Sequence, residues 1–158
     1  MNFLYWLEES ALGVWVAQSW GYPLVLSCHA VGMSIVVGTV IMINLRLLGF
    51  ARDVPLTLFT ELARITWIGV ILNVLSGLAL FSGNPVKFFF HPVFWIKISL
   101  IVLGGLSSWW GLRCVRAANF DDTVLESANR IKIIAGFSLL FWSGAIVAGR
   151  LIAYFKLF

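Results

Sequence analysis

Long apolar runs separated by short polar stretches dominate the pattern of the 158-residue chain. A helix that crosses the hydrocarbon core of a bilayer needs about 20 predominantly apolar residues. Four runs reach this length, and we predict a membrane-spanning helix in each: about 23–48, 62–81, 89–112 and 131–154, the third starting at Phe89 or Val93. The pattern therefore predicts an all-α fold, with residues 1–158 forming one transmembrane four-helix bundle.

Residues 2–19 form a different kind of segment. Their apolar positions follow helical spacing, they include the adjacent acids Glu8 and Glu9, and a Gly-Tyr-Pro break at 21–23 ends them. We predict an interfacial amphipathic helix that lies on the membrane, with a short fifth span as the alternative. Residues 2–12 contain no Lys or Arg, whereas a signal peptide starts with basic residues, so we expect the segment to be retained.

The composition excludes several classes of protein. Apolar residues make up 61% of the chain and charged residues only 11%, where a soluble domain has roughly 25% charged residues. The mean hydropathy is +0.97. A soluble domain of this size has no way to bury so much apolar surface, so a soluble enzyme, a nucleic-acid binder and a disordered chain are excluded.

The basic residues predict the orientation in the membrane, because loops rich in Lys and Arg stay in the cytoplasm. Seven basic residues belong to the side that holds the first and third connections between spans: Arg46, Arg52, Arg64, Arg113, Arg116, Arg130 and Lys132. The opposite side has four: Lys87, Lys97, Arg150 and Lys156. We therefore expect a multi-pass protein of the bacterial inner membrane with both termini in the periplasm, and basic loops facing anionic lipid.

Small residues recur at helical spacing within the predicted spans. They are Ser34 and Gly38 on the first, Gly69, Asn73 and Gly77 on the second, and Gly136, Gly144 and Ala148 on the fourth. Such faces let helix backbones approach closely in lipid. We expect them to pack helix against helix, with room for a flat cofactor as the alternative.

Two histidines stand out, because polar groups inside a membrane are costly and mark functional sites. His29 lies in the first predicted span and His91 at the start of the third, and both of these spans begin on the outer side. Their depths are therefore expected to match, and neutral imidazoles are suitable axial ligands for haem iron. We predict that His29 and His91 ligate one b-type haem.

Two cations and several aromatic residues lie near the same predicted level. Arg150 and Lys97 are candidate partners for the haem propionates, since cationic side chains bind carboxylates. Trp95 and Trp20, together with Tyr22, are candidates to flank the edge of the ring.

Other interpretations of these residues remain open. One alternative is a structural role for both histidines, with Lys97 and Arg150 reaching the interface along their aliphatic stems. Cys28, His29 and Met33 form a weaker candidate copper site. Asn73 is most simply a hydrogen-bonding residue between helices, with contact to a quinone as the alternative.

Several chemistries have no signal in the sequence. The chain has no Cys-x-x-Cys-His, so covalent c-type haem attachment is excluded. Cys28 and Cys114 are expected near opposite membrane faces, too far apart for a disulfide. No Gly-x-Ser-x-Gly, Walker loop or His-Glu-x-x-His occurs, and no acid lies deep in a span. Hydrolysis, phosphoryl transfer and an acidic proton relay are therefore not expected, and no catalytic residue is assigned.

Short ordered motifs resemble a family of small four-span bacterial inner-membrane proteins. They comprise Glu9, Ser10, Leu12 and Gly13, then Tyr22 and Pro23, His29, Gly32, residues 44–49 as Asn-Leu-Arg-Leu-Leu-Gly, Trp67, Phe94 with Lys97, and residues 149–154 as Gly-Arg-Leu-Ile-Ala-Tyr. Asn44 stands where that family often has Asp. The resemblance implies a four-span fold, loosely similar to membrane b-type cytochromes and copper-resistance membrane proteins, and implies no established activity. The family motifs include positions matching His29, Lys97 and Arg150, but not His91.

Two functions follow from the sequence as expectations. The first is a membrane electron-transfer subunit holding one bis-His haem b near the periplasmic face, working with a periplasmic redox protein and possibly a quinone. The second is an accessory or anchoring subunit of a larger membrane complex, with no cofactor of its own. Copper handling is a minor third, and no nucleic-acid partner is expected.

Overall fold

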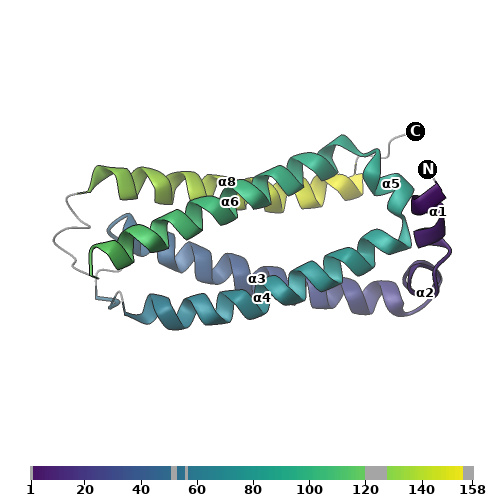
Figure 1. Ribbon diagram of the computed structural model, residues 1–158, viewed down its shortest axis with the longest axis horizontal. Helices are drawn as coiled ribbons and strands as arrows, with labels where there is room; N and C mark the ends of the chain where they lie inside the picture. Colours follow the sequence, from purple (N-terminus) through teal and green to yellow (C-terminus); the bar gives the residue numbers. More distant parts are fainter. Residues whose placement is uncertain (1, 51–52, 56, 120–127, 155–158) are drawn as a thin grey trace.

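Four long helices form the protein in the computed structural model, which describes residues 2–50, 53–55, 57–119 and 128–154 (Figure 1). They are α3 (Gly21–Leu47), α4 (Leu58–Gly83), α6 (Pro92–Ala117) and α8 (Asn129–Tyr154). None of the described residues is in a β-strand. The all-α prediction is confirmed, and each long helix covers most or all of a predicted span.

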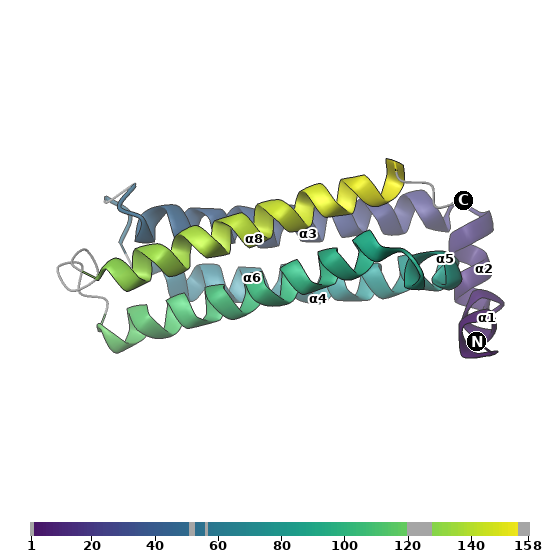
Figure 2. The same cartoon turned by 90° about the horizontal axis from the view of Figure 1, so that it is seen from above.

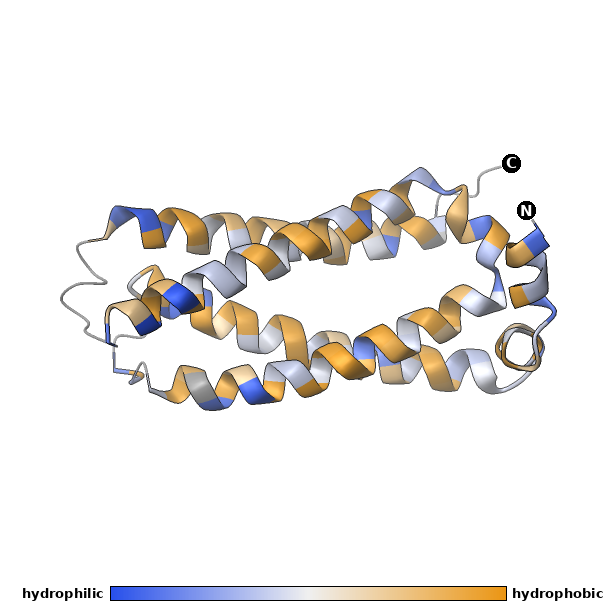
Figure 3. Ribbon diagram, viewed as in Figure 1, coloured by the Kyte–Doolittle hydropathy of each residue, from blue (hydrophilic) through white to orange (hydrophobic). Residues whose placement is uncertain are grey.

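All four helices are long and apolar enough to cross a membrane. Figure 3 shows hydrophobic residues, in orange, along most of the length of these helices. Many large apolar side chains point outward, among them Trp67, Leu78 and Leu140, each more than 60% exposed. An outer surface of this kind suits lipid and not water. The chain is therefore a multi-pass membrane protein.

The bundle consists of two helical hairpins, α3 with α4 and α6 with α8. Each hairpin has extensive internal contact, while α3 and α8 make the main contact between hairpins. The two perpendicular views agree, since α8 runs beside α3 and α6 runs on the side of α4 (Figures 1 and 2). Helices that follow one another along the chain therefore form the two hairpins, as short connections favour.

Glycines allow the close approach within the first hairpin. A Cβ added to Gly32 would lie 3.0 Å from the backbone nitrogen of Asn73, and one added to Gly69 would lie 2.8 Å from Cγ2 of Ile35. The predicted packing face of Gly69, Asn73 and Gly77 is confirmed. Dispersion contacts at such short range stabilise helix pairs in lipid, where no hydrophobic effect drives them together.

The prediction for Ser34 and Gly38 is wrong. Ser34 is exposed and bonds back to the carbonyl of Ala30 at 2.9 Å, while a Cβ on Gly38 would meet nothing within 4 Å. The buried face of α3 at this level is instead formed by valines: Val36, Val37 and Val40. Gly136 of the fourth helix likewise faces open space, although Gly144 contacts Leu100 and Ala148 is buried. Small size permits close packing but does not choose the face.

A buried polar network joins the two hairpins. The amide of Asn44 on α3 donates to Oγ of Ser138 on α8 at 2.9 Å, and Ser138 bonds to Ser108 on α6 at 3.0 Å. The indole of Trp142 donates to the same Ser108 hydroxyl at 3.2 Å and packs on the valines of α3. Three helices therefore meet through hydrogen bonds that have no competition from water in the bilayer.

The N-terminal segment folds as two short helices, α1 (Asn2–Glu8) and α2 (Ala11–Gln18), and not as the single helix predicted over 2–19. Ser10 causes the break, because its hydroxyl accepts from Gly13 N–H at 3.1 Å and donates to the carbonyl of Leu7 at 2.6 Å. Both helices lie across one end of the bundle (Figure 2). We call this the α1–α2 end.

A further short helix, α5 (Pro85–Phe89), was not predicted. The third predicted span began at Phe89 or Val93, but Phe89 belongs to α5 and the next long helix starts at Pro92. Proline at the first helical position explains this start, since it lacks an N–H that the helix would otherwise leave unpaired. The indole of Trp95 donates to the carbonyl of Phe89 at 2.8 Å and fixes the corner.

Adjacent glycines on α6 provide a test of the contact between α6 and α8. A Cβ on Gly104 would lie 2.9 Å from Nε1 of Trp142, whereas one on Gly105 would meet nothing within 4 Å. We expect Gly104→Ala to lower the free energy of unfolding by about 1–3 kcal/mol through overpacking. Gly105→Ala should be neutral or stabilise the helix by up to about 1 kcal/mol. Unfolding in mixed micelles, followed by circular dichroism, measures both; equal effects would contradict the packing.

Candidate functional site

Polar side chains from three of the long helices gather in the half of the bundle nearer the α1–α2 end. His29 comes from α3, Ser76 from α4 and Lys97 from α6. His29 lies eight residues after the start of α3, about 12 Å along its axis. The site is therefore inside the span and not at its edge.

The ring of His29 has a defined orientation. Its Nδ1 lies 3.0 Å from Oγ of Ser76, and that hydroxyl also lies 2.6 Å from the carbonyl oxygen of Leu72. A hydroxyl has a single proton, and the carbonyl can only accept. Ser76 therefore donates to Leu72 and accepts from the Nδ1–H of His29. This leaves the lone pair of Nε2 available to a metal ion or a proton.

Gly77 provides space for this ring. A Cβ at Gly77 would lie 3.3 Å from Cε1 of His29 and 3.7 Å from Nδ1. An added methyl group would therefore require the imidazole to shift slightly. The glycine of the predicted packing face thus also positions a candidate ligand.

Lys97 brings a positive charge to the same region. Its Cε and Nζ lie 3.6 Å and 3.8 Å from where a Cβ of Gly149 would be, so the side chain runs along α8. Within the described part of the chain, no acid forms an ion pair with it. A cation left without an acid in a membrane span suggests an anionic ligand.

Asn73 adds an acceptor one helical turn from Ser76. Its Oδ1 is buried and has no hydrogen-bond partner among the residues that the structure describes. An unmatched buried acceptor costs free energy. The site therefore offers one cation and two acceptors, Nε2 of His29 and Oδ1 of Asn73.

His91 is almost completely buried, with 1% of its surface exposed, and stands immediately before α6. Its backbone N–H donates to Phe88 and its carbonyl accepts from Phe94, so the residue joins α5 to α6. Six residues separate it from Lys97, which places it about 9 Å nearer the α1–α2 end. No described contact joins the rings of His91 and His29, and their shared ligation of one iron stays a prediction.

The remaining predicted residues lie around this cluster. Arg150 is exposed, although its neighbour Gly149 touches Lys97. Trp20 is 87% exposed at the start of α3, and the ring of Trp95 packs edge-to-face on Phe89 and Phe94. Their roles beside a cofactor stay predictions.

The minor copper hypothesis concerns the same part of α3. Cys28 is partly buried, as is Met33 five residues later. In the described ranges, no group of three or more His, Cys, Asp or Glu side chains is arranged to hold a metal ion. A haem held by two histidines would not form such a group of three.

Ser76 is the site residue that sequence analysis missed. Its partner His29 lies 47 residues away, a contact that spacing along one helix does not reveal. The available signal was its place beside Gly77 and one turn after Asn73, on the face already expected to pack.

Comparison with protein-family models, with curated proteins and with solved structures found no match to this chain.

The position of Lys97 generates a stability prediction. We expect Lys97→Met, which keeps the length of the side chain and removes the charge, to raise the free energy of unfolding by about 1–3 kcal/mol. Lys87→Met, on the exposed part of α5, is the matched control and should change it by less than about 0.5 kcal/mol. Unfolding in mixed micelles measures both. Destabilisation by Lys97→Met would show that the charge supports the fold and not a ligand.

Proposed function

We propose that this protein is a membrane-embedded electron-transfer subunit that holds one haem b in the half of the bundle nearer the α1–α2 end. The observation that carries the proposal is the geometry of His29, whose Nδ1 lies 3.0 Å from the Ser76 hydroxyl, an arrangement in which the proton on Nδ1 leaves the lone pair on Nε2. Haem-ligating histidines use a ring nitrogen in this way, with the other nitrogen donating to a fixed acceptor.

The surroundings of His29 suit the rest of such a group. Lys97, whose side chain lies against α8 near Gly149, would supply a positive charge for a propionate carboxylate. A neutral imidazole adds no charge to be buried. His91, buried immediately before α6, would hold the haem iron together with His29, and Arg150 would bind the second propionate.

Each side chain of the site has a distinct task in this proposal. Ser76 fixes the tautomer and rotation of His29, Gly77 leaves space for the ring, and Lys97 balances negative charge. Haem supplies one-electron transfer. The balance of basic residues favours an orientation with the α1–α2 end on the periplasmic side of a bacterial inner membrane, where a periplasmic redox protein is the proposed exchange partner.

The first test is a reduced-minus-oxidised optical spectrum of the protein purified in mild detergent. We expect a sharp b-type α band, and its near-complete loss in His29→Ala and in His91→Ala, since each removes an axial ligand. Ser34→Ala, an exposed position on α3, is the matched control and should keep the band. A colourless wild-type protein without iron would overturn the proposal, and co-purification with defined subunits would then favour an accessory role.

A second test addresses the bond between Ser76 and His29. Removing the acceptor of Nδ1–H with Ser76→Ala should lower haem retention about 10–100-fold, as loss of a ligand's hydrogen-bond partner typically does. Titration of haem into the apoprotein measures it. Ser27→Ala, whose exposed hydroxyl bonds only to the carbonyl of Pro23 at 2.7 Å, is the control. Equal haem affinity in Ser76→Ala and wild type would remove Ser76 from the site.

A further inference from the structure

One exposed stripe of α6 changes character toward the end of the bundle opposite the α1–α2 end. Positions three, four and seven apart lie on one helix face. On this face the apolar Val102 and Leu106 come first, Trp109 follows, and Arg113 and Arg116 come last. All five side chains are exposed, so the stripe faces the surroundings of the bundle. Its order is apolar, aromatic, cationic.

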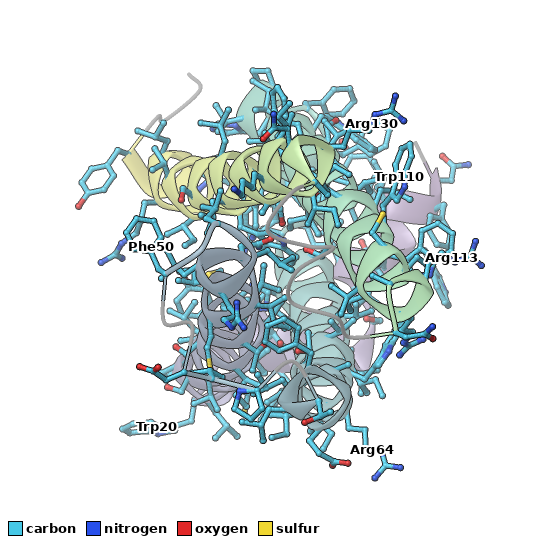
Figure 4. The ribbon with its side chains drawn as sticks, turned by 90° about the vertical axis from the view of Figure 1, so that its left-hand side faces the viewer. Trp20, Phe50, Arg64, Trp110, Arg113 and Arg130 are labelled. Carbon is cyan, nitrogen blue, oxygen red and sulfur yellow. The ribbon has the colours of Figure 1, made fainter. Side chains whose placement is uncertain are left out.

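One cation of the stripe contacts an aromatic ring. The guanidinium carbon of Arg113 lies 4.1 Å from the centroid of Trp109, a cation–π contact that keeps the arginine beside the helix. Trp110 is exposed as well, and Arg130, in the first turn of α8, lies on the same side of the molecule at a separate position in the end-on view of Figure 4.

These two arginines differ from Arg64 on α4. A guanidinium nitrogen of Arg64 lies 3.6 Å from a carboxylate oxygen of Glu61, so Arg64 already has an acidic partner. No acid in the part of the chain that the structure describes forms an ion pair with Arg113 or Arg130. The fork of N–H donors on a guanidinium group suits a phosphate.

The order along the stripe points to the source of that phosphate. A phospholipid presents its acyl chain, then its interface, then its phosphate, in the same sequence as Val102 and Leu106, Trp109, and Arg113. Tryptophan is enriched at this interfacial level of membranes. A free phosphate ion would have no use for the apolar part of the stripe. We propose that this face binds an anionic phospholipid, with its phosphate on Arg113 and an acyl chain along Val102 and Leu106.

Native mass spectrometry of the protein, released from bilayers of equal phosphatidylglycerol and phosphatidylethanolamine, tests the proposal. The readout is the ratio of the two lipids that stay bound. We expect a ratio above one for wild type, and a reduction of roughly fivefold for Arg113→Gln, as a single basic residue near anionic lipid contributes. The proposal does not depend on the presence of haem.

Arg64→Gln is the matched control, because it removes an equally exposed cation that already has Glu61 as its partner. It should leave the lipid ratio unchanged. An equal loss in Arg64→Gln, or an unchanged ratio in Arg113→Gln, would overturn the proposal. Helix content by circular dichroism confirms that each variant folds.

Inorganic phosphate distinguishes the two sources of the anion. Adding it at millimolar concentration during release should leave the bound phosphatidylglycerol in place, since the ion lacks the apolar contacts. Displacement of the lipid by phosphate would show that Arg113 binds a small anion alone, and would overturn the assignment to phospholipid.

Discussion

Helices in a bilayer gain nothing from hiding apolar surface from one another, because lipid tails are as apolar as the side chains. Every contact that holds this bundle together must therefore come from close packing or hydrogen bonding. The first hairpin relies on close packing, through Gly32 against Asn73 and Gly69 against Ile35. The two hairpins are joined by hydrogen bonds, from Asn44 through Ser138 to Ser108. Trp142 belongs to both kinds of contact, since it packs on Gly104 and donates to Ser108.

The same constraint explains why the candidate site is conspicuous. Burying a polar side chain within a span is costly. Such a side chain is therefore expected either to hydrogen-bond within the fold or to bind a ligand. The network around Ser138 is matched donor to acceptor and is accounted for by the fold. The cluster around His29 is different: it holds the cation of Lys97 without an acid and the buried oxygen of Asn73 without a donor among the described residues. Polar groups that the fold does not use are the reason for assigning function to this half of the bundle.

The two ends of the bundle have different chemistry. At the α1–α2 end, two short helices lie across the bundle, and Val16 of α2 packs against Gly83 at the end of α4. At the opposite end, α6 presents Arg113 over the ring of Trp109. The proposed redox site and the proposed lipid-binding face therefore belong to opposite ends of the bundle.

The sequence by itself determined the four spans, because the hydropathy of a window of about 20 residues is a local property. It also singled out His29 and Lys97, since a polar residue in an apolar run is visible without a structure. It missed the break at Ser10, where a hydroxyl ends one helix and caps the next inside an otherwise apolar segment.

Only the tertiary structure decided which helix faces meet. The partners of His29 and Asn44 lie 47 and 94 residues away, and the face with Ser34 and Gly38 turned outward although its spacing resembles that of the packed face. In lipid all faces of a helix are similarly apolar, so the choice among them depends on shape and hydrogen bonds between distant segments, which a one-dimensional pattern does not contain.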